Sequence, residues 1–191
     1  MATLIDRNGL RPDTWRAFDG DAAAVPPDAD LLLPLDEWRE RASVWGARPG
    51  RLGILLAPSD DPAAIAADLG RFALVAVGFP AFTDGRGYSS ARLLRERHGW
   101  RGELRAVGDV LRDQLFLLAR CGFDTFALRD DQDPRAALAA FGDFDVRYQS
   151  GVDEPVPLFR RRDAAVAAGR GRPRSRAACT SSGPGPARPT C

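Results

Sequence analysis

The chain has 191 residues, enough for one ordinary domain, and a core of that size needs no disulfide or metal. Its 27 basic and 26 acidic residues give a net charge of +1, which argues against a globally basic nucleic-acid-binding protein. Every basic residue is an arginine, which excludes a lysine Schiff base. The charge is uneven: residues 1–162 hold 22 Arg and 25 acidic residues, whereas residues 163–191 hold five Arg and one Asp.

The three cysteines, Cys121, Cys179 and Cys191, form no CxxC pair and are too few to hold an iron–sulfur cluster within the chain. The sequence after Met1 turns polar too early for the apolar core of a signal peptide. No run approaches the ~20 apolar residues of a membrane span. We therefore expect a cytoplasmic protein without a membrane partner.

Apolar runs and helical stripes alternate along the chain from residue 31 onward. Residues 1–30 predict an N-terminal segment packed on the body, with a short edge strand at Thr3–Ile5. Further strands are predicted at residues 31–33, 52–56, 73–79, 104–107, 124–128 and 145–149. Helices are predicted at residues 36–45, from Pro62 onward with Ser59 or Asp60 as the cap, and at 88–98, 110–120 and 134–141.

Strands that alternate with helices predict parallel pairing through right-handed crossovers. The expected fold class is α/β, with a parallel sheet of about five to six strands in either an open three-layer arrangement or a partial βα barrel. We expect one domain at residues 31–159. The apolar content then falls, which predicts a disordered Arg/Pro/Gly-rich tail at residues 160–191. Its Gly169–Arg174 run is similar to an AT-hook core, but a solvated tail is favoured and no nucleic-acid partner is expected.

Two polar loops follow adjacent predicted strands, at residues 83–89 and 108–114. In parallel α/β folds, loops at the carboxyl ends of the strands bind ligands. The first loop carries Asp84, Arg86, Tyr88 and Ser89. A serine at a helix start and an arginine fork predict an anion site for sulfite, sulfate, phosphate or a carboxylate. The alternative is a helix cap in which Asp84 and Arg86 pair with each other.

The second loop supplies the candidate catalytic residues. They are Asp109 and Asp113, since either carboxylate could act as a general acid or base. Arg112 and Gln114 would bind an anion or orient a water, and Arg105, on the preceding strand, is a further anion-binding candidate. A structural Arg–Asp network accounts for the same residues equally well.

The evidence for a cofactor or a metal is slight. Residues 85–90 read G-x-G-x-x-S, which departs from the dinucleotide fingerprint because the third position is serine rather than glycine or alanine. No cofactor is therefore evident, and flavin or NADPH has only this partial motif in its favour. The single histidine, His98, falls at a predicted helix end opposite both loops, so no Ser–His pair and no zinc site are expected.

The stretches FTDGRGYSSARLLRER, GELRAVGDVLRDQL and RCGFDTFALR resemble an uncharacterised bacterial family. Members of that family are described as oxidoreductases involved in sulfite reduction, because they sit beside sulfite-reduction components. The resemblance extends more weakly from Leu4 to Phe159. It implies a role in assimilatory sulfite reduction, with sulfite reductase or another sulfur-assimilation enzyme as partner and a small oxyanion as ligand.

Two functions are therefore open. The first is an accessory protein or oxidoreductase of sulfite reduction that binds an oxyanion or docks on sulfite reductase, with the electrons held by the partner. The alternative is a non-redox α/β enzyme that acts on a small carboxylate or phosphate ester. In that enzyme Arg86 and Arg112 would clamp the anion, and Asp84, Asp109 or Asp113 would serve as acid or base.

Overall fold

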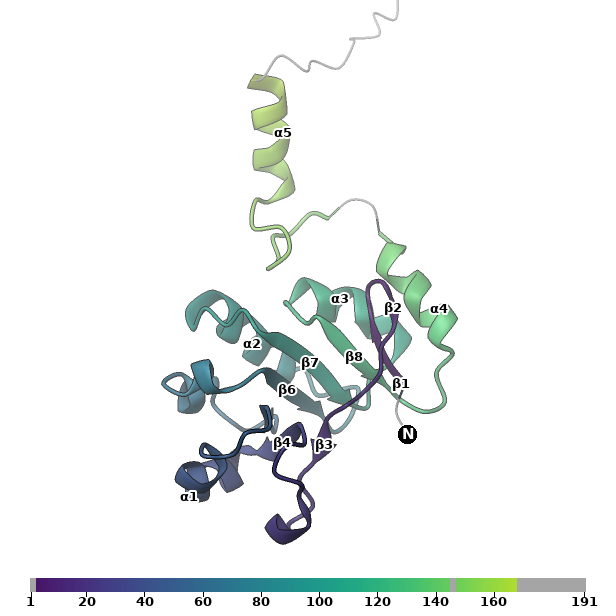
Figure 1. Cartoon of the computed structure of the whole chain (residues 1–191). Coiled ribbons are helices and arrows are strands. Elements are labelled where there is room, and N and C mark those ends of the chain that lie inside the picture. The colour runs from purple at the N-terminus through teal and green to yellow at the C-terminus, as the bar shows by residue number, and fades with distance from the viewer. Residues whose placement is uncertain (1–2, 145–146, 168–191) are drawn as a thin grey trace, which may run out of the picture.

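The structure, a computed structural model, describes residues 3–144 and 147–167 (Figure 1). Within these residues, eight strands form one curled sheet in the order β2-β1-β8-β7-β6-β5-β4-β3. The six strands β3 to β8 are parallel, while β1 is antiparallel to both β2 and β8. The strands are β1 (Thr3–Asp6), β2 (Gly9–Leu10), β3 (Arg16–Ala17), β4 (Leu31–Pro34), β5 (Leu52–Leu56), β6 (Leu74–Phe79), β7 (Glu103–Gly108) and β8 (Thr125–Leu128).

The helices follow the strands in turn. The α-helices are α1 (Leu35–Trp45), α2 (Arg86–Arg92), α3 (Leu115–Arg120), α4 (Pro134–Ala139) and α5 (Leu158–Ala167). Short 3-10 turns are η1 (Ala22–Ala24), η2 (Pro62–Ile65), η3 (Leu69–Arg71), η5 (Arg112–Gln114) and η6 (Ala140–Gly142), and η4 (Leu93–Arg97) is a π-helical turn that extends α2. In the π turn His98 N–H donates to Leu93 O at 3.0 Å, one residue farther than in an α-helix.

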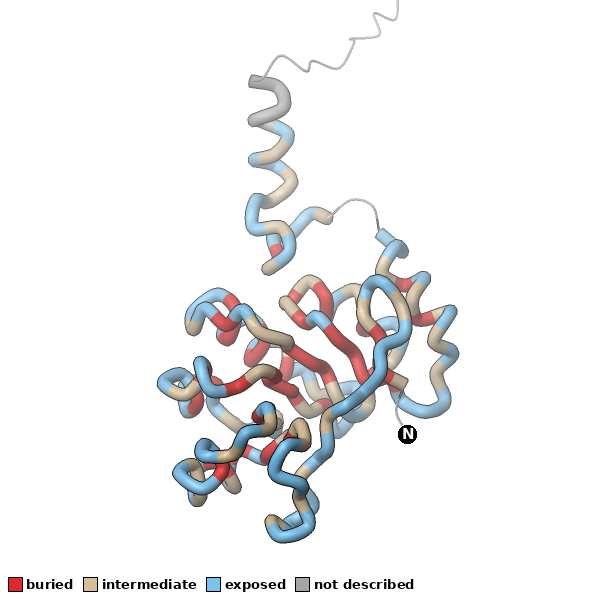
Figure 2. The backbone as a smooth tube through the Cα atoms, viewed as in Figure 1, coloured by how far each residue is buried: buried red, intermediate tan, exposed pale blue. Residues whose placement is uncertain are grey.

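The parallel strands lie side by side in chain order, as in half of a βα barrel. Side chains alternate between the two faces of each strand. On β6, Val75, Val77 and Phe79 belong to the main core, which also contains Ala91 and Leu94 of the helical layer. Figure 2 shows this buried core in red along the strands. The predicted α/β class is confirmed, and of its two arrangements the structure has the partial barrel.

The other face of the sheet is crossed by the amino-terminal strap, residues 11–15. The strap joins β2 and β3, which lie at opposite edges of the sheet, and Figure 1 shows this purple segment running across the strands. Trp15 packs over Gly53 of β5, and Asp13 forms an ion pair with Arg105 of β7 at 2.8 Å. Leu74 of β6, on the same face as Arg105, is fully buried. The N-terminal segment is therefore built into the sheet and closes its open face.

Several predicted elements differ from the structure. Thr3–Ile5 was expected at an edge, but β1 pairs on both sides, because β2 adds the outer strand. The helix expected from Pro62 is two short 3-10 turns, and Asp61 rather than Ser59 or Asp60 caps the first of them, accepting from Ala63 N–H at 2.9 Å. The helix expected at 110–120 begins as η5 and becomes α-helical only at residue 115.

The carboxyl-terminal predictions are tested only in part. Of the strand expected at 145–149, residues 147–149 are not in a strand, and residues 145–146 lie outside the described residues. The tail expected to be disordered from residue 160 is helical through Ala167, where it completes α5. Residues 168–191, including the AT-hook-like run and Cys179 and Cys191, lie outside the described residues.

Candidate functional site

The start of α2 places the first loop differently from the prediction. The helix begins at Arg86 after Gly85, and no side chain in the described part of the chain caps it. Ser89 therefore lies within the helix and is exposed, and the hydroxyl of Ser90 donates back to Arg86 O at 3.4 Å. Neither serine sits among the free amides of the helix start, because the chain becomes helical two residues earlier than expected.

Arg86 has an internal partner in the same loop. Its Nε and Nη2 donate to the two carboxylate oxygens of Asp84 at 3.0 and 2.7 Å. These hydrogen bonds hold the pKa of Asp84 below its usual range. This is the pairing that the sequence offered as the alternative to an anion site. A ligand at Arg86 would have to share the guanidinium with Asp84 or displace it.

The two predicted loops touch through two side chains of the second loop. Asp109 accepts from Phe82 N–H at 2.9 Å, and the Gln114 amide donates to Phe82 O at 3.1 Å. Gly108 makes the approach possible: its φ is +102°, and a Cβ there would lie 2.4 Å from Phe79 O. Asp109 and Gln114 therefore tie together the loops that follow β6 and β7.

Arg129, at the end of β8, completes this edge of the sheet and was not singled out from the sequence. It donates to Asp109 at 2.7 Å and to Asp131 through two nitrogens at 2.6 and 2.7 Å. The hydrogen bonds from Arg129 lower the pKa of Asp131 to about 2. The signal in the sequence was an arginine directly after a buried strand, at the same edge as Asp109.

The remaining predicted residues do not gather at one point. Arg112 turns toward α4, donating to Ala136 O at 2.9 Å, and Asp113 is exposed. Tyr88 packs edge-on against Phe79 with the ring centres 5.5 Å apart, and burial raises the pKa of its hydroxyl.

Arg105 lies away from both loops. Its side chain is 4 % exposed and is ion-paired to Glu103 at 2.9 Å and to Asp13 of the strap at 2.8 Å. Arg105 therefore fastens the strap to β7, and its donors are already taken by two carboxylates.

A cavity of about 410 Å³ opens at the carboxyl ends of β4 to β7. Its described lining is mainly apolar and includes Leu55, Pro58, Gly78 and Val107, together with the acidic residues Asp36 and Asp60. Sites at this edge are the usual ligand-binding position in parallel α/β folds. No arginine is among the described residues that line it, so the cavity suits an apolar ligand better than an anion.

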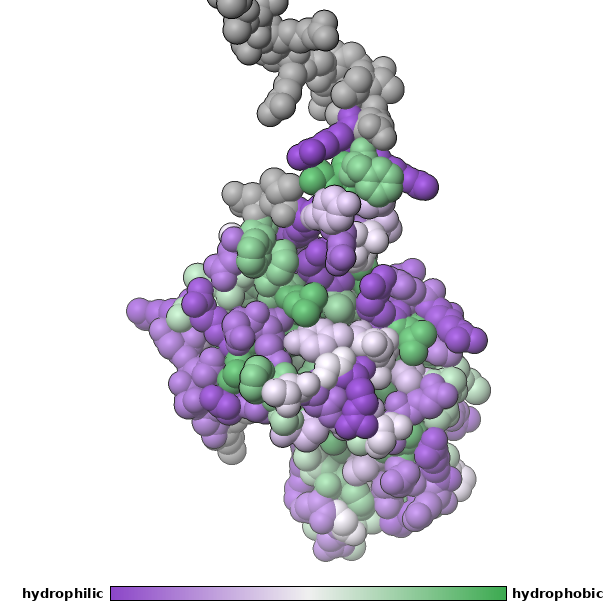
Figure 3. All heavy atoms as spheres, turned by 180° about the vertical axis from the view of Figure 1, so that it is seen from behind, coloured by the Kyte–Doolittle hydropathy of each residue, from purple (hydrophilic) through white to green (hydrophobic). Residues whose placement is uncertain are grey.

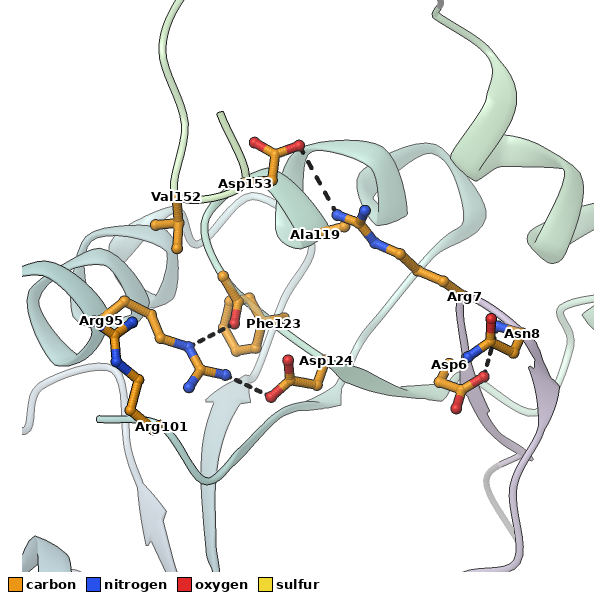
Figure 4. A pocket seen from close by; sticks show the side chains of 11 residues that line it. Asp6, Arg7, Asn8, Arg95, Arg101, Ala119, Phe123, Asp124, Val152 and Asp153 are labelled. Carbon is orange, nitrogen blue, oxygen red and sulfur yellow. Dashed lines mark hydrogen bonds and ion pairs between the residues drawn. The ribbon is translucent and has the colours of Figure 1, made fainter. Parts of the chain in front are cut away.

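A second cavity, of about 460 Å³, lies near the opposite edge of the sheet (Figure 4). Arg95 of the π turn lines this cavity and donates four hydrogen bonds. Its Nε donates to Gly122 O, and its Nη1 donates to Trp100 O and Gly102 O, each at 2.9 Å. Its Nη2 donates to the carboxylate of Asp124. Figure 4 shows the guanidinium of Arg95 bonded to Asp124, in the turn that precedes β8. Its donors hold the backbone together and are not free for a ligand.

Two observations bear on metals and membranes. Within residues 3–144 and 147–167, no group of three or more His, Cys, Asp or Glu side chains is placed to hold a metal ion. In the same part of the chain, no helix combines the length and apolar character needed to cross a membrane.

The two candidate acids can be separated by mutation. We expect Asp109→Ala to lower the free energy of unfolding by about 1–2 kcal/mol, because Phe82 N–H loses a charged acceptor. Asp113→Ala, an exposed position on the same loop, should change it by less than about 0.5 kcal/mol. Urea unfolding of both variants gives the two values. Equal losses would show that Asp109 does not link the loops.

Comparison with known proteins identifies the family of this chain. No match to a curated protein was found. Residues 53–159 match the family described as "Bacterial protein of unknown function (DUF934)". The match covers β5 through the first residues of α5, including both loops and Arg129. Because it spans more than half of the 191 residues, the chain belongs to the DUF934 family of bacterial proteins.

Proposed function

We propose that this protein is an accessory protein of bacterial sulfite reduction that docks on a partner enzyme through the surface at the base of α5. The pathway rests on the sequence resemblance described above, and sulfite reductase is the partner it suggests. The mode of action rests on one observation, an exposed aromatic surface beside a helix that stands away from the body. In this proposal the partner carries the redox cofactors. The cytoplasmic location expected from the sequence stays a prediction.

The docking surface consists of Phe116, Leu117, Phe144, Tyr148 and Phe159. Four of these side chains are large, apolar and at least half exposed, with Leu117 at 50 %, Phe144 at 59 %, Tyr148 at 74 % and Phe159 at 54 %. Phe116 and Phe144 pack with ring centres 4.9 Å apart and share a groove of about 290 Å³ with Tyr148. Clustered exposed aromatic residues are typical of protein interfaces.

Helix α5 strengthens this interpretation. It has ten residues, and Figure 1 shows it projecting from the body. Its side chains described up to residue 162 include none that is buried, as the colours of Figure 2 show. Its root is attached by Leu158 N–H to Tyr148 O at 3.3 Å and by Arg161 to Arg147 O at 2.9 Å. A helix this short is marginal without packing, so a partner that covers it would stabilise it.

The positive charge and the apolar side chains of this surface indicate the chemistry of the partner's docking face. Arg160 and Arg162 are exposed on α5, and Arg147 stacks over Phe116 with its guanidinium carbon 5.5 Å from the ring centre. In Figure 3 hydrophobic green and hydrophilic purple surface lie together at the projecting helix and below it. An apolar groove edged with acidic side chains would be complementary to this arrangement. We therefore expect an acidic docking face on the partner.

The alternative enzyme has less support from the geometry. It requires Arg86 and Arg112 to face one anionic substrate. Arg86 is paired with Asp84, whereas Arg112 points toward Ala136 and lies 3.6 Å from Asp143. The two guanidinium groups are thus engaged with different parts of the chain, and docking is the better-supported function.

Calorimetric titration with purified sulfite reductase tests the proposal. The double variant Phe144→Ala/Phe159→Ala should bind at least about tenfold more weakly, because aromatic anchors dominate interface energies. Phe82→Ala is the matched control, since Phe82 is also a phenylalanine, 54 % exposed, on the loop after β6. Binding should also weaken as salt rises. Absence of binding by the unmodified protein, or an equal loss in Phe82→Ala, would overturn the proposal.

A further inference from the structure

A third cavity, the arginine cavity, lies at the amino-terminal ends of β5 and β6. Its volume is about 550 Å³. Three segments build it: the end of α1 and the turn after it, the residues that lead into β5, and η3 with the residues that lead into β6. The described residues that line it include Gly46, Arg48, Gly50, Arg51, Gly70 and Arg71, and none of them is acidic. It is the opposite edge of the sheet from the loops where the sequence predicted an anion site.

The three guanidinium groups are held by different partners. Arg51 forms a bidentate pair with Asp30 and lies 5.2 Å from the ring centre of Trp15. Arg71 lies 3.6 Å from Asp68 and stays 58 % exposed. These two arginines are therefore placed at the cavity by neighbouring carboxylates, which lie outside its lining.

Arg48 differs from the other two. Its Nη2 donates to three backbone carbonyls, those of Pro26, Pro27 and Ala29, at 2.7, 3.2 and 2.9 Å. Its Nη1 is buried and has no hydrogen-bond partner among the residues that the structure describes. The described contacts give Arg48 no carboxylate, so three guanidinium groups meet two carboxylates and one positive charge is left in excess. A buried donor without an acceptor destabilises the fold. An anion in the cavity would accept a hydrogen bond from this donor and would also balance the excess positive charge.

The other residues that line the cavity suit the organic part of a small-molecule ligand. The apolar residues Leu52, Phe72 and Ala73 are among its lining, and a Cβ added at Gly70 would meet no described atom within 4 Å, which leaves the backbone there open. The volume falls within the range of small-molecule sites and exceeds the space that one inorganic oxyanion fills. Arginine forks match the geometry of phosphate and sulfate oxygens.

We propose that the arginine cavity binds the phosphate or sulfate group of a small organic molecule, with Arg48, Arg51 and Arg71 as its cationic groups. This site is separate from the docking surface and does not depend on the proposed partner. It also relocates the oxyanion site that the sequence placed at Arg86. In this proposal the anion binds in the arginine cavity, and the loops after β6 and β7 have a structural role.

Two-dimensional ¹⁵N NMR titration of the full chain tests the site. The probes are phenyl phosphate, phenyl sulfate, inorganic phosphate and benzyl alcohol. We expect saturable shifts of the Gly46, Gly50 and Gly70 amides with the two esters, weaker shifts with inorganic phosphate, and none with the uncharged alcohol. The stronger ester identifies the group that the site prefers.

Variants then assign the binding to the arginines. Arg71→Gln should weaken the preferred ester at least about tenfold, which corresponds to about 1.4 kcal/mol. Arg39→Gln is the control, because Arg39 is similarly exposed, at 52 %, and is paired with Asp36 outside the cavity. Arg71 is surface-exposed, so its variant should fold, and a thermal melt checks this. No shift at the three glycines with either ester, or equal weakening in both variants, would overturn the proposal.

Discussion

Replacement of Arg95 by alanine is expected to lower the free energy of unfolding by about 3–5 kcal/mol, because three backbone carbonyls lose a charged donor. Arg95 is 8 % exposed and donates to three backbone carbonyls and to Asp124. Without it, the carbonyls of Trp100, Gly102 and Gly122 lose their donor, and only water entering from the adjacent cavity could replace it. The same carboxylate of Asp124 accepts from Leu104 N–H at 2.9 Å, so the start of β7 would loosen as well.

A matched control lies one turn earlier. Arg92 is 47 % exposed and pairs with Glu96 four residues later, at 3.0 Å. Arg92→Ala should therefore cost no more than about 0.5 kcal/mol. Guanidinium chloride unfolding of the two variants measures both values. If the two losses were similar, the carbonyl network around Arg95 would not be holding the turn to β8.

Replacement of Arg105 by alanine should have a somewhat smaller effect, about 2–3 kcal/mol, because the Glu103 and Asp13 side chains that lose their partner are 31 % and 43 % exposed. The Arg105 side chain is 4 % exposed and bridges Glu103 and Asp13. Glu103 also accepts from the Thr125 hydroxyl at 2.7 Å, so the loss reaches β8. Since Arg105 is the contact that fastens the strap to β7, amide hydrogen exchange in residues 11–15 should accelerate together with the loss of stability.

Asp13→Asn separates the strap from the buried charge. The Asp13 side chain is 43 % exposed, so its variant should lose only about 1 kcal/mol while exchange in the strap still accelerates. In Arg105→Ala both stability and strap protection should fall. Unchanged exchange in residues 11–15 in both variants would mean that Trp15, rather than the ion pair, holds the strap in place.

The part of the fold that follows local pattern was predictable from the sequence. Strands such as β6 are short apolar runs between helical stripes, and chain-order parallel pairing follows from right-handed crossovers. The place of β1 inside the sheet was not predictable from the sequence, because it depends on pairing between residues more than a hundred positions apart, such as Thr3 and Leu128. The helix predicted from Pro62 was also wrong, because the apolar spacing of this segment suits a helix but the chain forms two 3-10 turns.

For the candidate site, the sequence placed both loops at the carboxyl ends of the strands but did not identify the partners of their side chains. It named Asp109 and Gln114, and the structure shows both binding the neighbouring loop. It offered the Asp84–Arg86 pair as one of two alternatives. The arginine cavity was beyond reach, because Arg48, Arg51 and Arg71 carry no motif and meet only when α1 and η3 fold against the same end of the sheet.

The position of β1 also sets the order in which the molecule can be completed. Strand β1 precedes its partner β8 by more than a hundred residues, so the pairing must wait until the chain has been made as far as Leu128. Strands β4 to β7 can meanwhile assemble neighbour by neighbour, which keeps most contacts local and fast. The strap, which contacts Gly53 of β5 and Arg105 of β7, can close the open face only once these strands are in place, so its closure is a late step in the assembly of the fold.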